Sequence, residues 1–162
     1  MKKIILTKDK VALVDDEDFE RINQYKWQAS QNLTSERIWY AKRVSKAISG
    51  KQKTIKMHRE ILKDTEGLQV DHINGNGLDN RKVNLRLCTN QQNHFNRKLP
   101  NKNNKLGVKG VYIEGVKFRA RIKSNSKRIN LGSFNVLGDA DSAYRKAEEK
   151  YFGCYARNHQ KV

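Results

Sequence analysis

The chain has 162 residues, with 34 lysines and arginines against 17 aspartates and glutamates, and therefore a formal net charge of +17. A length of this order allows one or two small domains and excludes a large enzyme scaffold. So large a basic excess favours a polyanionic partner, usually nucleic acid and less often an anionic membrane. An aromatic content of 8% still allows small hydrophobic cores, so we expect a folded protein.

Several protein classes are excluded by the same composition. No segment approaches the run of about 18 apolar residues that predicts a membrane-spanning helix, and residues 1–8 are too briefly apolar for a signal peptide. Cys88 and Cys154 have no partner cysteine at ligand spacing, which argues against a zinc finger and against a disulfide scaffold. We therefore expect a protein of the reducing cytoplasm with no membrane partner.

The first part of the chain, residues 1–70, predicts a small β-rich region. Val11 to Val14 is a short apolar run typical of a strand. Trp27 and the stretches over residues 38–41 and 54–57 are aromatic or β-branched, and they predict further strands.

A run of four acidic residues, Asp15 to Asp18, interrupts this β-rich region. It precedes Phe19, Ile22 and Tyr25, which have helical spacing, so we expect a helix to begin at the acidic run. Carboxylates there interact favourably with the positive end of the helix dipole. A metal site is the alternative interpretation, but the helix start explains the run fully.

The central part of the chain, residues 68–98, predicts a strand, a loop, a second strand and a helix. A short β run from Leu68 to Ile73 contains an Asp-His pair, and a loop rich in glycine and asparagine follows. Residues 85–88 form the second strand. Thr89, with Gln92 three residues later, predicts a capping box that opens a helix over about Asn90 to Lys98.

These residue types suit phosphodiester hydrolysis, which needs a base for water and a divalent cation for the developing charge. A neutral imidazole suits the first role, and carboxylate and amide oxygens suit a hard cation. Asp71 and His72 are adjacent, so on a strand their side chains point to opposite faces. One can then hold a metal while the other faces water, and Asn93 can reach the metal from the helix. An Asp-His pair also occurs by chance, so composition alone predicts only a nucleic-acid binder.

This segment resembles the HNH endonucleases, whose nuclease centre is called the ββα-metal motif, and more closely their His-Asn-Asn subgroup of phage homing enzymes. The resemblance implies that His72 is the general base and that Asn84 braces the loop and orients the histidine. It further implies that Asp71 and Asn93 are the ligands of a single Mg²⁺ or Mn²⁺. The residues that carry the resemblance are Asp71-His72, Asn74-Gly75-Asn76, Leu78-Asp79-Asn80-Arg81, Asn84-Leu85-Arg86 and Asn93.

Four neighbouring residues have less specific interpretations. Asn80 and Arg81 either pin the loop or contact phosphate, and for Asn80 we favour the structural role. His58 either contacts phosphate or is a packed, hydrogen-bonded histidine. His94 follows Asn93 directly, but one helical step turns it by about 100°, so Asn93 is the better candidate ligand.

The last part of the chain predicts a three-stranded antiparallel sheet packed on one helix. Residues 117–123 alternate strictly between cationic and apolar side chains, and residues 128–132 repeat the alternation after a turn. Residues 110–113 form the third strand, and a helix is predicted from Asp139 to Phe152. One sheet face should therefore present long cations, which can enter the major groove of DNA. A solvated surface is the alternative interpretation.

This C-terminal part resembles the Apetala-type domain of plant ethylene-response factors, which also occurs in phage and bacterial HNH nucleases. The resemblance implies that the sheet lies in the major groove of double-stranded DNA. The DNA-binding positions of the family correspond here to Arg119, Arg121 and Arg128. We interpret three further cations as phosphate contacts: Lys109, Lys117 and Lys123. The matching segments are residues 107–112, 118–122, 131–134 and 151–157, with Phe118 where the family usually has tryptophan.

We therefore predict an α+β chain with the N-terminal β-rich region and the nuclease domain in residues 1–99. A linker covers residues 100–106, and the Apetala-type domain covers residues 107–158. The predicted function is a site-specific, homing-type DNA endonuclease that works as a monomer in the cytoplasm, of the host cell if a phage encodes it. No small-molecule organic cofactor is expected. A DNA-binding regulator that keeps the nuclease fold without activity is the alternative, and an RNA binder is a weaker one.

Overall fold

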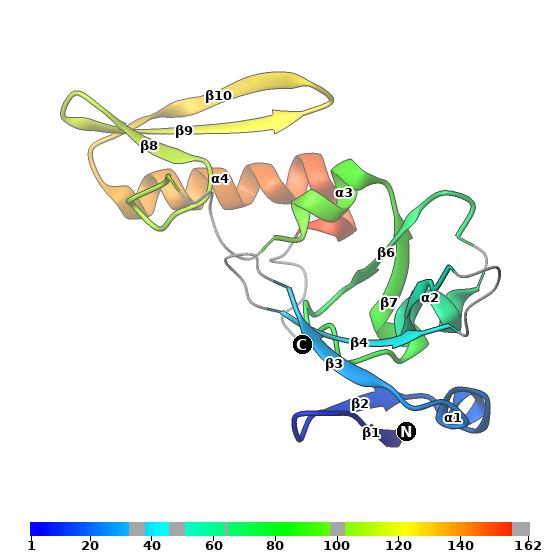
Figure 1. Ribbon diagram of the computed structural model, residues 1–162. Coiled ribbons are helices and arrows are strands. Elements are labelled where there is room, and N and C mark those ends of the chain that lie inside the picture. The colour runs from blue at the N-terminus through cyan, green and yellow to red at the C-terminus, as the bar shows by residue number, and fades with distance from the viewer. Residues whose placement is uncertain (33–37, 46–50, 64, 98–102, 157–162) are drawn as a thin grey trace. The chain divides into compact units, whose positions relative to one another are not determined.

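A computed structural model of the chain describes residues 1–32, 38–45, 51–63, 65–97 and 103–156 (Figure 1). The described residues cluster into two compact units, Met1–Asn90 and Gln91–Val162. The predicted mixture of helices and strands is confirmed. Residues 100–102 of the predicted linker, the predicted helix end at Lys98 and Arg157 of the Apetala-type match lie outside the described residues.

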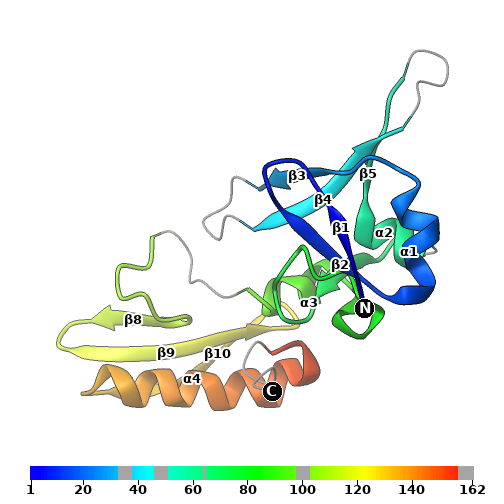
Figure 2. The same cartoon turned by 90° about the horizontal axis from the view of Figure 1, so that it is seen from below.

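The described residues of the first unit form three small antiparallel sheets, β1–β2, β3–β4–β5 and β6–β7, of which the first two are labelled in Figure 2. Two helices and a 3₁₀ turn connect them. The elements are β1 (Lys2–Ile5), β2 (Val11–Val14), α1 (Asp16–Asn23), β3 (Gln28–Gln31), β4 (Trp39–Val44), β5 (Thr54–Lys56), α2 (Met57–Leu62), β6 (Gln69–His72), η1 (Lys82–Asn84) and β7 (Leu85–Cys88).

A single hydrophobic core joins these sheets and helices. It includes Val14 of β2, Ile22 of α1, Trp27 and Met57, all of which are buried. Because every one of the small sheets contributes to this core, none of them has to be stable alone. The core thereby holds the N-terminal elements against the β6–β7 hairpin, which carries the Asp71-His72 pair.

Two local expectations in this unit were wrong. The helix after the acidic run ends at Asn23, so Tyr25 is not on its apolar stripe and is instead exposed. The physical reason is Trp27, whose buried indole Nε1 donates to the carbonyl oxygen of Ile22 at 2.9 Å and so satisfies a helix-end acceptor. Met57 also does not extend β5, because it begins α2 and lies fully buried.

The second unit contains one antiparallel sheet with the order β10–β9–β8 and a long helix, α4 (Leu137–Phe152), along it (Figure 1). The strands are β8 (Val111–Glu114), β9 (Lys117–Ser124) and β10 (Lys127–Phe134). Ile122 and Ala120 of the sheet are buried in clusters with residues of α4. The described part of the unit also contains η2 (Gly153–Tyr155). Helix α3 (Asn90–Phe95) belongs to this unit as well, except for its first residue, Asn90.

Close packing in this unit depends on a glycine and on a ring stack. At Gly110 a side-chain Cβ would lie 1.9 Å from the ring of Tyr144, and the backbone φ there is +68°, so only glycine fits. The rings of Phe95 and Phe152 stack with centroids 3.7 Å apart, which attaches α3 to the end of α4.

None of the helices in the described part of the chain combines the length and the apolar character needed to span a bilayer.

Candidate active site

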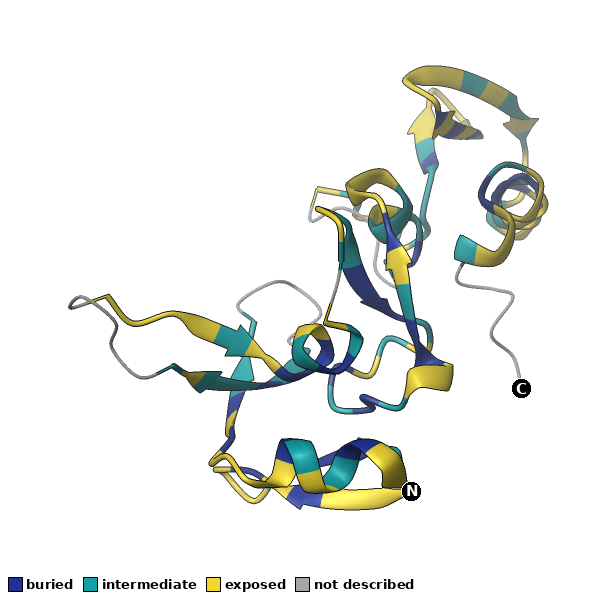
Figure 3. Cartoon of the chain, turned by 90° about the vertical axis from the view of Figure 1, so that its right-hand side faces the viewer, coloured by how far each residue is buried: buried dark blue, intermediate teal, exposed yellow. Residues whose placement is uncertain are grey.

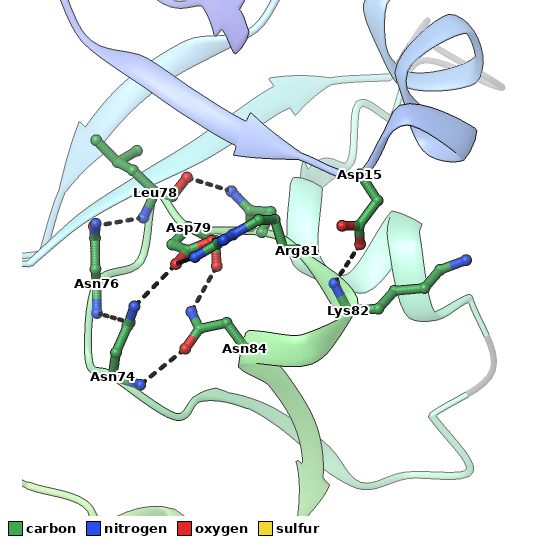
Figure 4. Close-up of polar contacts among 9 residues, drawn as sticks. Asp15, Asn74, Asn76, Leu78, Asp79, Arg81, Lys82 and Asn84 are labelled. Atoms are coloured by element: carbon green, nitrogen blue, oxygen red, sulfur yellow. Dashed lines mark hydrogen bonds and ion pairs between the residues drawn. The ribbon is translucent and has the colours of Figure 1, made fainter. Parts of the chain in front are cut away.

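The loop between β6 and β7 is held by hydrogen bonds across its two sides (Figure 4). Asn84 accepts from the backbone N–H of Asn74 at 2.9 Å through Oδ1, and its Nδ2 donates to the carbonyl oxygen of Asp79 at 2.7 Å. Asn74 in turn donates from Nδ2 to Asp79 Oδ2 at 2.9 Å. Asn84 is buried and uses both ends of its amide, so it joins the two sides of the loop.

Asp79 is the charged centre of this loop. Its carboxylate is 2% exposed and accepts two hydrogen bonds from Arg81, each of 2.7 Å. These bonds hold the pKa of Asp79 below its ordinary value, so the carboxylate stays ionised. The structure therefore gives Arg81 a loop-pinning partner, which is one of the two roles expected for it.

The N-terminal hairpin pairs with the same loop. The backbone N–H of Leu13 donates to the carbonyl of Leu78 at 2.9 Å, and the N–H of Asn80 donates to the carbonyl of Leu13 at 2.8 Å. Asp15, in the acidic run, accepts from the backbone N–H of Lys82 at 2.7 Å (Figure 4). The β1–β2 hairpin and the acidic run thus support the loop, which sequence reasoning did not foresee.

Gly77 lets this loop approach the second sheet closely. A Cβ at this position would lie 2.4 Å from the carbonyl oxygen of Trp39 and 2.6 Å from the ring of Tyr40. Such contacts are too short for any side chain, so the loop reaches strand β4 only because residue 77 is glycine. The close approach packs the loop against Tyr40.

His72, at the end of β6, is oriented by Asn80. Its Nε2 lies 3.3 Å from Oδ1 of Asn80, and both side chains are buried. Asn80 Nδ2 donates to the carbonyl oxygen of Leu78 at 3.1 Å, which turns Oδ1 toward the histidine. An amide oxygen can only accept, so the hydrogen-bond network assigns the imidazole proton to Nε2 and the basic lone pair to Nδ1.

Two further rings surround His72. The ring of His58, from α2, lies edge-on with its centroid 4.9 Å away, and the ring of Tyr40, from β4, lies 5.8 Å away. His58 is 4% exposed and therefore packed, but its buried Nδ1 has no hydrogen-bond partner among the described residues, so only the packing of the second interpretation is found. Sequence reasoning missed Tyr40, because nothing in strand β4 indicates that it meets a histidine 32 positions later.

Burial keeps both imidazoles neutral. Burial lowers the pKa of His72, although the hydrogen bond to Asn80 opposes the shift. Burial also lowers the pKa of His58 to about 2, and electrostatic repulsion from the neighbouring His72 is the next cause. A neutral imidazole at physiological pH retains the lone pair that a general base needs.

The buried histidines should make the first unit sensitive to acid. The unfolded chain binds a proton at His58 near pH 6.5, whereas the folded chain does not until about pH 2, so stability is lost as the pH falls below 6.5. At pH 5 the loss from His58 alone is about 2 kcal/mol. Urea unfolding followed by tryptophan fluorescence measures it, since Trp27 and Trp39, the chain's two tryptophans, both lie in the first unit.

The control for this prediction is His58→Gln, which cannot take up the proton. The difference in unfolding free energy between pH 7 and pH 5 should be smaller in the variant by about the same 2 kcal/mol. Equal pH dependence in the two proteins would show that His58 is already protonated in the folded chain.

Asp71 lies opposite Arg86 in the antiparallel register of β6 and β7. Its Oδ2 accepts from Arg86 Nε at 2.9 Å and from Nη2 at 2.6 Å, and both side chains are largely buried. The two hydrogen bonds fix the orientation of the carboxylate group. Sequence reasoning missed this pair. The register of the hairpin could have indicated it, because directly opposed residues on adjacent strands are neighbours.

The proposed metal ligands come from both units. Asp71 belongs to the first and Asn93, a partly buried residue of α3, to the second. Carboxylate and amide oxygens are hard donors, which fit Mg²⁺ or Mn²⁺. No cluster of three or more histidine, cysteine, aspartate or glutamate side chains that could hold a metal occurs among the described residues. The ligand pair therefore stays a prediction.

Buried and exposed residues lie next to one another in the sheet of the second unit (Figure 3). Along β9, Ala120 and Ile122 are buried, whereas Arg121 and Lys123 are exposed. Lys117 and Arg128 are exposed as well. A cavity of about 800 Å³ beside this part of the sheet is lined by several cations and by no carboxylate of the described residues; its cationic residues include Arg97, Lys105, Arg121, Lys123 and Arg128.

Two of the expected DNA contacts have protein partners. Lys109 Nζ lies 2.6 Å from Oε1 of the buried Glu148, so its charge compensates a carboxylate inside the unit, and we remove Lys109 from the proposed phosphate contacts. Arg119 Nε lies 2.6 Å from Oε2 of Glu114 and 3.1 Å from Oγ of Ser133. The ion pair partly compensates the charge of Arg119, one of the cations expected on this face of the sheet.

Comparison with known proteins agrees with this geometry. The protein-family model described as HNH endonuclease matches residues 64–95, which include the loop and His72. Protein 3.8 of Escherichia phage T7 is 34% identical over 94 residues, covering 57% of this chain and 76% of that protein. The chain therefore contains an HNH endonuclease domain. No solved structure matches it.

A second relative of this chain carries the name of the HNH endonucleases. An uncharacterized HNH endonuclease, L560, of Acanthamoeba polyphaga mimivirus is 28% identical over 130 residues, covering 76% of this chain and 67% of that protein. The family model ends at residue 95, so it covers the loop and all of α3 but not the sheet of the second unit.

Proposed function

We propose that this protein is a site-specific, homing-type DNA endonuclease that hydrolyses phosphodiester bonds with one bound divalent cation. The observation that carries the proposal is His72, which is buried, neutral and held by Asn80 on a braced loop inside the region that matches the HNH family. Such an imidazole has the fixed orientation and the free-energy preference for the neutral form that a general base requires.

In the proposed reaction, Nδ1 of His72 takes the proton from a water molecule. The water oxygen forms a bond to phosphorus while the bond from phosphorus to the 3′ oxygen of the neighbouring nucleotide breaks. Asn80 holds the imidazole through Nε2 during the transfer. Positioning of this kind, with proton transfer, is worth about 10²–10⁴-fold in rate.

Asp71 and Asn93 are the residues that would hold the Mg²⁺ or Mn²⁺ ion. When bound, the ion stabilises the negative charge that develops on the phosphate and on the leaving oxygen. Arg86 limits the rotation of Asp71 through two hydrogen bonds to one carboxylate oxygen.

We further propose that the second unit supplies most of the DNA affinity as an Apetala-type domain, with its sheet in the major groove. Arg121, Lys123 and Arg128 are exposed on the sheet and lie around the basic cavity. Arg121 also lies over the ring of Tyr112, with its guanidinium carbon 4.6 Å from the centroid, which limits its conformations. Cations held in this way lose less side-chain entropy on binding DNA.

Cleavage of DNA tests the enzymatic part of the proposal. Purified protein with Mg²⁺ should convert supercoiled plasmid that carries the target to nicked circles, because one nuclease site in a monomer cuts one strand. EDTA should stop the reaction, and excess Mg²⁺ should restore it. Sequencing the ends cut from a random library identifies the target. Binding to DNA without cleavage of any library member would favour the alternative, an inactive DNA-binding regulator.

Arg121→Ala should weaken DNA binding and make it less dependent on salt. The slope of log affinity against log salt should become shallower by about one unit for a lost phosphate contact. The matched control is Lys146→Ala, which removes one charge from an exposed position of α4. Fluorescence anisotropy at several salt concentrations measures both variants. The same slope in Arg121→Ala as in the unmodified protein would remove Arg121 from the interface.

A further inference from the structure

One face of the β3–β4–β5 sheet carries cations next to the candidate base. Side chains alternate along β4, and on one side Arg43 forms an ion pair with Glu60 at 2.9 Å. Tyr40 and Lys42 lie on the other side of the strand. The ring of Tyr40 contacts both His58 and His72, so this second face adjoins the two histidines.

Two lysines are directly opposed on this face. Lys42 of β4 pairs with Lys56 of β5 in the antiparallel register. Directly opposed side chains on adjacent strands have their Cβ atoms about 4.5–5.5 Å apart, and like charges there are destabilising. The neighbours that share the face are uncharged: Gln28, Ser30, Tyr40, Val44 and Thr54.

No carboxylate compensates these two lysines in the part of the chain that the structure describes. Neither lysine forms an ion pair there, whereas Lys2 and Lys82, in the same unit, both do. The contact recorded for Lys56 is with the ring of Tyr40, whose centroid lies 5.6 Å from Nζ. Two unpaired like charges in register indicate that an external anion occupies this face when the protein works.

The lysine pair is also close to the nuclease centre. Nζ of Lys56 lies over the ring of Tyr40, and that same ring lies 5.8 Å from the ring of His72. The positive charge of Lys56 adds to burial in lowering the pKa of both His72 and His58, as expected for an ammonium group near the two imidazoles. An anion bound between the lysines would therefore lie beside the general base.

We propose that Lys42 and Lys56 bind backbone phosphates of the DNA strand that His72 cuts, next to the scissile bond. The inference rests on the proposed nuclease function and assigns DNA contacts to the N-terminal sheet, in addition to those of the second unit. The phosphates offset the repulsion between the two lysines and place the strand across Tyr40. A DNA backbone is the occupant, because its phosphates must pass His72 in any productive complex.

The test compares Lys42→Gln and Lys56→Gln with Lys2→Gln. Each variant removes one positive charge, but Lys2 lies 3.7 Å from Glu20 and over Phe19, so its charge is already paired within the protein. DNA affinity is measured at several salt concentrations in the His72→Ala background, in which cleavage is expected to be too slow to disturb the binding measurement. Each variant of the pair should bind severalfold more weakly, with a salt slope shallower by about 0.9. Lys2→Gln should keep both the affinity and the slope.

Ethylation interference on the target duplex locates the contacts. Ethylated phosphates beside the cut should inhibit binding of the Lys2→Gln protein and should no longer do so in Lys42→Gln or Lys56→Gln. Melting temperatures should be unchanged or slightly raised, because each substitution removes a repulsion, and this excludes misfolding as the cause. An unchanged slope or interference pattern in both lysine variants overturns the inference, even if cleavage falls.

These measurements separate the inference from the proposed function. If the unmodified protein cuts DNA and both lysine variants bind as it does, the inference fails and the nuclease function stands. If the unmodified protein cuts no DNA with Mg²⁺, the nuclease function fails. The salt slopes still decide in that case whether the two lysines bind DNA.

Discussion

Replacement of His72 by alanine is expected to lower the rate of DNA cleavage by about 10²–10⁴-fold, the range that a general base contributes. The reason is that Nδ1 carries the basic lone pair, since Nε2 is held by Asn80 Oδ1. Single-turnover cleavage with Mg²⁺ measures the effect, because it isolates the chemical step from product release.

DNA affinity is the control for this variant. His72 is buried and uncharged, so its loss should leave the affinity and the salt slope as they are. Asn80→Ala should reduce cleavage less than His72→Ala, because it removes the orientation of the imidazole and keeps the base. Cleavage by His72→Ala at the rate of the unmodified protein would assign the proton transfer to another group.

Asn84→Ala is expected to destabilise the first unit by about 2 kcal/mol, because it leaves a backbone donor and a buried backbone acceptor without their partner. These are the N–H of Asn74 and the carbonyl of Asp79. Cleavage should also fall under conditions where the variant is fully folded, since the loop that places Asn80 beside His72 loses its brace. Urea unfolding followed by tryptophan fluorescence measures the first effect, and single-turnover cleavage measures the second.

Two variants of the same loop separate bracing from general damage. Asn84→Asp keeps an oxygen for the N–H of Asn74 but places a buried carboxylate against the carbonyl oxygen of Asp79, so it should be destabilised at least as much as Asn84→Ala. Asn76→Ala removes a 3.1 Å bond from Leu78 N–H at an exposed position and should change stability little. Equal stability of Asn84→Ala and Asn76→Ala would show that Asn84 does not hold the loop.

Local patterns predicted several elements of this fold closely. The second strand of the central hairpin runs from Leu85 to Cys88 as expected, and the alternation of residues 117–123 matches strand β9. Helix α4 ends at Phe152, before Gly153, also as expected. Such patterns are readable because the side-chain period of a strand or helix is written in consecutive residues.

Partners that are distant in sequence could not be predicted in this way. The sequence identified His72 and Asn84 through a spacing that resembles a known motif. It did not indicate that His58 and Tyr40 lie against His72, or that Lys109 pairs with Glu148, 39 positions later. These neighbours depend on how separate elements pack, and many packings satisfy the same local pattern.

The sequence by itself determined a basic protein with a candidate histidine base, a carboxylate beside it and a cationic strand, since charge, residue type and periodicity are local properties. The tertiary structure alone decided which charges are compensated. Arg119 and Lys109 have carboxylate partners, whereas Lys42 and Lys56 are opposed across a sheet beside His72 with none among the described residues. The physical reason is that a charge acts through its distance to other charges, which folding sets by bringing remote residues together.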